Sequence, residues 1–150
     1  MSPELPRAMG ALILRQPFWT RDPDGLLAED LGVWRRWQAA HAPLYIAFAF
    51  NVRLLTVTRQ PPDDSPTARA WLDSLAKRAD AIGFKNDGTA DLIEINRDPG
   101  PTALGQLLTY QALWRRQYAE PLTALILVAE TIDPDLGPAL ADHSILVHLA

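Results

Sequence analysis

Blocks of apolar and polar residues along the chain predict a mixture of helices and strands. Residues 26–40 place apolar side chains close to helical spacing, and Pro43 ends this pattern. Residues 45–58 are rich in aromatic and β-branched side chains, which favours one long or bent strand. A proline-rich loop over residues 60–66 then precedes a short helical pattern over residues 67–77. The first half therefore predicts a helix, a strand and a second helix.

The middle of the chain predicts a β-hairpin followed by the clearest helix. Strands over residues 79–84 and 89–96 flank Lys85-Asn-Asp-Gly88, and Asp-Gly is a strong hairpin turn signal. Residues 102–118 follow with a helical pattern. Residues 122–130 are a continuous apolar run, typical of a strand buried on both faces. The helix must return the chain, so we expect this strand to pair in parallel with a hairpin strand.

The two ends of the chain differ in character. Residues 1–25 are interrupted by prolines and end in the turn signal Asp22-Pro-Asp-Gly25, which predicts an irregular N-terminal arm. Residues 133–142 predict a turn or short helix, and residues 144–149 a last strand. We therefore divide the chain into a proline-rich arm over residues 1–25 and one domain over residues 26–150, which is long enough for a single core.

Composition places the chain among globular proteins. Hydrophobic residues make up 48% and charged residues 21% of the sequence. No apolar run approaches the roughly 20 residues that a membrane helix requires, so we expect no membrane partner. The absence of cysteine excludes disulfides and thiolate metal sites, and fits a virion or a cytoplasmic location.

The charge balance points to protein partners more than to DNA. The net charge is −4 and the pI is about 5.2, whereas DNA affinity depends largely on neutralising phosphates. Lys77 and Lys85 are the only lysines, and no basic side chain other than histidine follows Arg116. We expect other protein subunits as partners, as a homo-oligomer or with virion proteins, and DNA contact stays possible.

A few polar residues stand out against these elements. Asp80 lies in an otherwise apolar strand, where an unpaired carboxylate is costly to bury. Glu94 and Asn96 share one face of the next strand, because side chains alternate with a period of two. Gln106 and Tyr110 are four apart and share a helical face. Glu94 could instead be an acidic residue at an exposed strand end, and Gln106 and Tyr110 could be ordinary surface residues. For the tryptophans and histidines, core, interface or structural roles are favoured.

The order of these residues resembles a known family of nucleases. An Asp, a hairpin turn, Asp91-Leu-Ile-Glu-Ile-Asn96 and then Gly105-Gln-Leu-Leu-Thr-Tyr110 resemble the PD-(D/E)XK nuclease superfamily. Together with Lys77-Arg-Ala-Asp80 and Ile132-Asp-Pro-Asp-Leu136, they are similar to small members encoded by tailed bacteriophages. The resemblance implies an α/β (α+β) fold: a restriction-endonuclease-like αβββαβ core, with a central mixed sheet flanked by helices.

The resemblance also assigns roles within the site. It implies that Asp80, Glu94 and the main-chain carbonyl of Ile95 hold Mg²⁺, which polarises the phosphate and activates the attacking water. Gln106 and Tyr110 would lie beside the metal, contacting DNA or positioning its ligands. Glu29 resembles a glutamate that some members contribute from the first helix, although its neighbour Asp30 is not separated from it by sequence alone.

The family's lysine position is where this chain departs from the pattern. Asn96 stands there, and it offers hydrogen bonds but no charge and a shorter reach. Loss of one catalytic group commonly costs on the order of 10²–10⁴ in rate. Lys85 and Arg97 are expected to face away from the carboxylates, which leaves Lys77 as the only other lysine.

Two functions follow from this departure. The first is a degenerate, non-catalytic protein without a cofactor, serving as a structural or assembly component of a phage virion in head completion or head–tail joining. On that reading the site residues are vestigial. The alternative is a Mg²⁺-dependent DNA endonuclease. Asp80 and Glu94 support the nuclease, while Asn96 and the acidic balance favour the assembly component.

Overall fold

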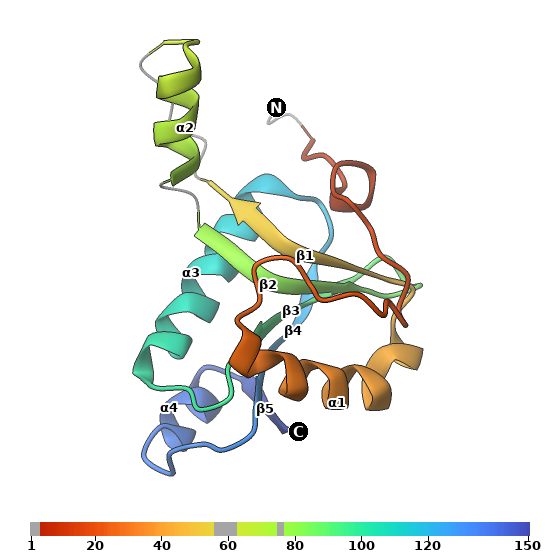
Figure 1. Ribbon diagram of the computed structural model, residues 1–150, viewed down its shortest axis with the longest axis vertical. Helices are drawn as coiled ribbons and strands as arrows, with labels where there is room; N and C mark the ends of the chain where they lie inside the picture. Colours follow the sequence, from red (N-terminus) through yellow and green to blue (C-terminus); the bar gives the residue numbers. More distant parts are fainter. Residues whose placement is uncertain (1–3, 56–62, 75–76) are drawn as a thin grey trace.

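The computed structural model describes residues 4–55, 63–74 and 77–150, and its centre is a five-stranded mixed sheet (Figure 1). The strands are β1 (Ala47–Leu54), β2 (Lys77–Phe84), β3 (Ala90–Ile95), β4 (Leu122–Ala129) and β5 (Ile145–Leu149). The helices are α1 (Leu31–His41), α2 (Pro66–Ser74), α3 (Pro101–Gln117) and α4 (Gly137–Asp142), with 3₁₀ turns at Ala8–Gly10, Ala28–Asp30 and Ala42–Leu44. None of the described helices is both long and apolar enough to cross a bilayer.

The sheet combines an antiparallel half with a parallel half. Its strand order is β1-β2-β3-β4-β5, in which β1, β2 and β3 pair antiparallel while β3, β4 and β5 pair in parallel. The predicted parallel pairing is therefore confirmed, with Glu94 on β3 opposite Leu127 on β4. The predicted αβββαβ order is present as α1, β1, β2, β3, α3 and β4; α2 is inserted between β1 and β2, and β5 is added at the edge.

Two apolar layers cover the two faces of the sheet. On one face, the indole rings of Trp34 and Trp37 from α1 pack on Phe48, Ile93 and Val128. On the other face, α3 and α4 pack their apolar side chains on the opposite residues of the same strands, with Leu107 and Leu127 fully buried. The alternation along each strand separates these layers. In contrast, α2 stands clear of the sheet at the top of Figure 1.

Several element boundaries differ from the sequence prediction. The helix expected over residues 26–40 is a 3₁₀ turn at Ala28–Asp30 followed by α1, because the backbone is extended at Leu27 and left-handed at Gly25. The helix expected over residues 67–77 has ended at Ser74, because Lys77 already pairs with Leu54 in the β1–β2 ladder. The strand expected over residues 45–58 is shorter, at Ala47–Leu54; residues 56–58 lie outside the described part of the chain.

The predicted hairpin is confirmed. β2 and β3 pair through Phe84 and Ala90, and Gly88 adopts a φ of +86° in the connecting turn. Only glycine reaches this region without strain, which explains the Asp-Gly signal.

The N-terminal arm, expected to be irregular, contains a 3₁₀ turn and is fixed to the rest of the protein by hydrogen bonds. Its 3₁₀ turn is anchored by Glu120, whose carboxyl oxygens accept hydrogen bonds from the backbone N–H groups of Ala8 (2.7 Å) and Met9 (2.9 Å). Further along, Arg15 exchanges two backbone hydrogen bonds with Phe48, at 2.7 and 2.8 Å, on the outer edge of β1. The arm therefore covers an edge that would otherwise carry unpaired backbone groups.

Candidate functional site

A hollow of about 160 Å³ collects most of the residues singled out in the sequence. It lies between β2, β3, the start of α3 and the loop that leads into α1. We call it the acidic pocket, because its lining includes the carboxyl groups of Asp30, Asp80 and Glu94. Asn96 and Gln106 also line it. The fold therefore brings together residues that are far apart in sequence.

Neighbouring strands hold the two central carboxyl groups in place. The Oδ2 atom of Asp80 accepts a hydrogen bond from the backbone N–H of Ile95 at 2.9 Å, and Oε1 of Glu94 accepts one from the backbone N–H of Asp80 at 3.1 Å. Each carboxyl group is thus tied to the main chain of the opposite strand, so its position is fixed by the β2–β3 pairing.

Burial changes the protonation of this pair. Loss of solvation, followed by the nearby charge of Asp80, raises the pKa of Glu94 to about 9. The pKa of Asp80 is also raised, chiefly by burial, while its hydrogen bond from Ile95 acts in the opposite direction. Two neighbouring buried carboxyl groups cannot both be ionised without a large cost in free energy. At neutral pH the protonated form of Glu94 is therefore favoured.

Asn96 has a structural role in the turn after β3. Its side-chain Oδ1 accepts a hydrogen bond from the backbone N–H of Asp98 at 3.0 Å, and its own N–H donates to the carbonyl of Val128 at 3.0 Å. This short side-chain to backbone bond is typical of asparagine at turns. The residue at the motif's lysine position thus shapes the chain at the mouth of the pocket and supplies no charge there.

Of the two acidic residues that the sequence left unseparated, Asp30 lines the acidic pocket and Glu29 does not. Glu29 is exposed and does not line the pocket. Asp30 is only 5% exposed, and its Oδ1 accepts a hydrogen bond from the backbone N–H of Arg97 at 2.8 Å. The adjoining 3₁₀ turn rotates Asp30 inward. Its position immediately before the apolar face of α1 is the signal that could have identified it.

Gln106 and Tyr110 lie on one face of α3, as expected, but they occupy different places. Gln106 lines both the acidic pocket and a neighbouring hollow of about 360 Å³, whereas Tyr110 lines only the second. Lys77 also borders this second hollow. Burial, then the charges of Glu94 and Asp80, raise the pKa of Tyr110 to about 12. Its hydroxyl therefore stays protonated and can donate a hydrogen bond near the carboxyl pair.

The basic residues nearest in sequence do not enter the acidic pocket. Lys85 lies across the sheet, where its Nζ contacts Oδ1 of Asp91 at 3.1 Å and donates to the hydroxyl of Thr123 at 2.7 Å. Arg97 is exposed and does not line the pocket either. Within the described part of the chain, the pocket's lining contains no cationic side chain.

The donor atoms of the pocket fit Mg²⁺ in type. Asp80, Glu94 and the carbonyl of Ile95 offer the hard oxygen ligands that Mg²⁺ prefers, and this ion commonly binds through one or two carboxylates and several waters. Across residues 4–55, 63–74 and 77–150, however, no three His, Cys, Asp or Glu side chains are grouped to hold a metal ion. Bound Mg²⁺ would supply charge to a phosphate and activate water; binding requires the carboxyl pair to release its proton.

Most of the large aromatic residues belong to the core. Trp34, Trp37 and Trp114 are fully buried. His41 and His148 stack with centroids 5.0 Å apart, and Nδ1 of His148 accepts a hydrogen bond from Nε1 of Trp37 at 3.0 Å. The histidine pair thus links β5 to α1, consistent with the structural role favoured from sequence.

Comparisons with known proteins identify no relative of this chain. No protein-family model, no curated protein and no solved structure matches the chain.

Proposed function

We propose that this chain is a non-catalytic, protein-binding component of a larger assembly, built on a nuclease-like core whose chemistry is lost. The observation that carries the proposal is the charge of the acidic pocket. Three carboxyl groups line it, and the described residues add no cationic side chain to its wall. Phosphoryl transfer needs positive charge where negative charge develops in the transition state, and the negative charge of the pocket's carboxylates opposes an anionic substrate.

The resemblance in the sequence suggests which assembly this is. We propose a virion of a tailed bacteriophage, with the protein in head completion or head–tail joining. The acidic net charge and the arm packed along β1 support an interface with protein subunits.

A Mg²⁺-dependent endonuclease is the second candidate. Two observations favour it: Asp80 and Glu94 converge on one hollow with Gln106, and Lys77 borders the adjoining hollow that shares Gln106. The ammonium group of Lys77, at the border of that hollow, could partly replace the charge of the missing lysine.

A cleavage assay separates the two functions. Purified protein is incubated with supercoiled plasmid and Mg²⁺ or Mn²⁺, beside Glu94→Ala, Asn96→Lys and Lys77→Gln variants. We expect no cleavage above the level of Glu94→Ala, because no charge stabilises the transition state. Light scattering on the same sample is expected to give a defined oligomer. Cleavage that is lost in both Glu94→Ala and Lys77→Gln would contradict the assembly role and establish the nuclease.

A further inference from the structure

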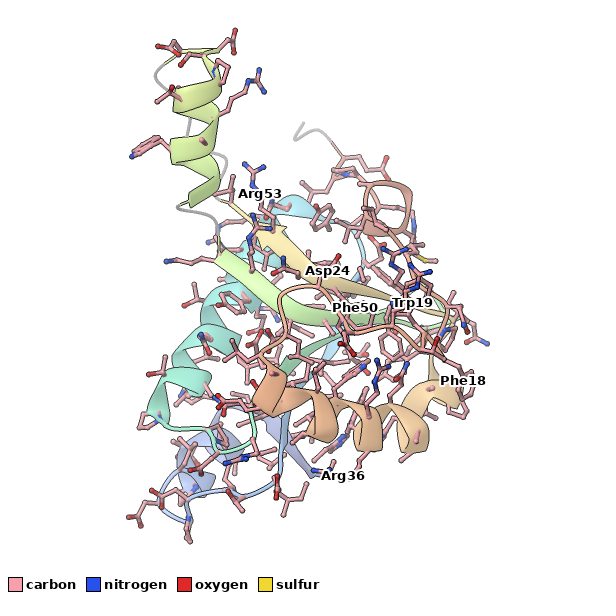
Figure 2. All side chains as sticks on the ribbon, in the orientation of Figure 1. Phe18, Trp19, Asp24, Arg36, Phe50 and Arg53 are labelled. Atoms are coloured by element: carbon pink, nitrogen blue, oxygen red, sulfur yellow. The ribbon has the colours of Figure 1, made fainter. Side chains whose placement is uncertain are left out.

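A separate hollow, of about 200 Å³, lies on the outer side of β1, apart from the acidic pocket and the hollow beside Tyr110. We call it the arginine pocket; it is lined by Phe50 of β1 and by six residues of the N-terminal arm: Ile13, Arg15, Trp19, Arg21, Asp22 and Asp24. Figure 2 shows Trp19, Asp24 and Phe50 near one another at this place. Unlike the acidic pocket, it combines guanidinium groups with an aromatic wall.

The indole of Trp19 positions both arginines. The guanidinium carbon of Arg15 lies 4.5 Å from the ring centroid and that of Arg21 lies 5.9 Å from it. Such cation–π contacts orient a guanidinium without using its N–H donors. Arg15 is further fixed by the backbone pairing of its own residue with Phe48.

The donors of these two arginines are unused. Neither guanidinium has a hydrogen bond or ion pair with any residue in the described part of the chain. The neighbouring Arg35, in contrast, is fully engaged: it binds Oδ1 of Asp22 at 3.0 Å and the carbonyl of Thr20 at 2.7 Å. Arg35 therefore braces the loop, and Arg15 and Arg21 are left to bind a ligand.

The surroundings define the kind of ligand. A guanidinium fork matches a carboxylate in geometry and charge. Ile13 lines the hollow and is 74% exposed, so apolar surface flanks the arginines. Asp22, which is paired with Arg35, and Asp24 also line the hollow. Together with the net charge of −4, they repel a chain of phosphates more strongly than a ligand with a single negative charge. These features favour a single carboxylate between apolar side chains over a nucleic acid.

We propose that the arginine pocket is a docking site for a protein partner, which inserts an Asp or Glu side chain flanked by apolar residues. The carboxylate pairs with Arg15 and Arg21, and its apolar neighbours pack on Ile13 and Phe50. The inference deepens the proposed assembly role, on which it rests, by naming the surface and the chemistry of the partner.

The test is an NMR titration that follows the indole N–H of Trp19, assigned with a Trp19→Phe variant. The probe is the peptide acetyl-Leu-Glu-Leu-amide, with acetyl-Leu-Gln-Leu-amide, inorganic phosphate and an oligothymidylate as comparisons. We expect saturable binding of the Glu peptide, with a Kd on the order of 1 mM, at least tenfold weaker binding of the Gln peptide, and no saturation with oligothymidylate.

Matched variants locate the binding. Arg21→Gln should weaken the Glu peptide about tenfold, the range of one charge-assisted hydrogen bond, while Asp24→Asn should strengthen it. Arg116→Gln is the control, since Arg116 is remote and donates to the carbonyl of Ala112 in its own helix. Equal binding of both peptides, equal losses in Arg21→Gln and Arg116→Gln, or tighter binding of oligothymidylate would each overturn the inference.

The titration tests the docking site and the cleavage assay tests the proposed function, so either can be contradicted without the other. A protein that cleaves DNA but binds the peptide would overturn the proposed function alone. A protein that cleaves nothing and ignores the peptide would overturn only the docking site.

Discussion

The loop over residues 22–27 separates two hollows of opposite character. Asp24 lines the arginine pocket, while Gly25, Leu26 and Leu27 line the acidic pocket. In the acidic pocket Asp30 and Glu94 are buried, whereas in the arginine pocket Arg21 and Asp24 are exposed.

The comparison shows how burial decides what a charged group can do. Glu94 is 6% exposed, so its charge is expensive to keep and a proton neutralises it. Arg21 is exposed, and water solvates its guanidinium at little cost while no ligand is bound. We therefore expect the arginine pocket, more than the acidic pocket, to offer charge to a partner.

Gly25 keeps the loop in place between the two hollows. Its φ is +79°, and a Cβ atom there would lie 2.5 Å from the side-chain Oδ1 of Asn51. Another residue would be strained at this φ, and its Cβ would collide with the side chain of Asn51 on β1. The two pockets therefore depend on the same close approach of backbone to sheet.

Releasing the N-terminal arm is expected to have the largest effect on stability. It should also disrupt the arginine pocket, which the arm lines, and so distinguish it from the acidic pocket. Glu120→Ala removes the acceptor of a buried hydrogen bond from the N–H of Ala8 and of a partly buried one from the N–H of Met9. It should lower the free energy of unfolding by about 2–4 kcal/mol. It should also abolish peptide binding, because the arm supplies Ile13, Arg15 and Trp19. Urea denaturation and the peptide titration measure these losses.

Glu130→Ala is the matched control. Glu130 pairs with Arg36 at 3.7 Å on the surface, with half of its side chain exposed, and such pairs contribute about 0–1 kcal/mol. If both variants lost the same stability and both kept peptide binding, Glu120 would not be the residue that holds the arm against the arginine pocket.

Neutralising Glu94 is expected to raise the stability of the protein, by less than the loss of Glu120 lowers it. Its pKa is raised in the folded state, so between the unfolded pKa and about 9 the folded protein holds a proton that the unfolded chain has released. Stability from this group is therefore full at low pH and falls as pH rises. Glu94→Gln imitates the protonated form and should stabilise the protein by about 1–3 kcal/mol at pH 8.

The gain should disappear below about pH 4, where Glu94 is protonated in both states. Thermal unfolding of the natural protein and Glu94→Gln across this pH range measures it. Glu29→Gln, at an exposed residue, is expected to change stability by less than about 0.5 kcal/mol at every pH. A loss of stability in Glu94→Gln at pH 8 would show that Glu94 is ionised in the fold.

Much of the fold was predictable because local signals and tertiary packing agree. The Asp-Gly turn at Gly88 sets the hairpin, and the apolar run from Leu122 gives the parallel strand β4. Lys77 illustrates a failure: its helical pattern was overridden by pairing with Leu54, a partner more than twenty residues away. Sequence periodicity contains no information about such a partner.

The site was predicted only in part, for a similar reason. Strand parity placed Asp80 and Glu94 together, because it depends on local geometry alone. Choosing Asp30 over Glu29 required the rotation of a 3₁₀ turn, which the sequence does not specify. The arginine pocket could not be predicted, since it forms only when the arm pairs with Phe48 and brings Trp19 beside Phe50.

The most direct test of the central claim is the titration of the Glu94 carboxyl carbon by ¹³C NMR, assigned with Glu94→Gln. Our account predicts a midpoint near 9, with a protonated side chain at pH 7, because burial beside Asp80 and the lack of a cation disfavour its charge. A midpoint below about 5, the ordinary range for glutamate, would mean that the pocket holds two ionised carboxylates ready for a metal, and would contradict the loss of its chemistry.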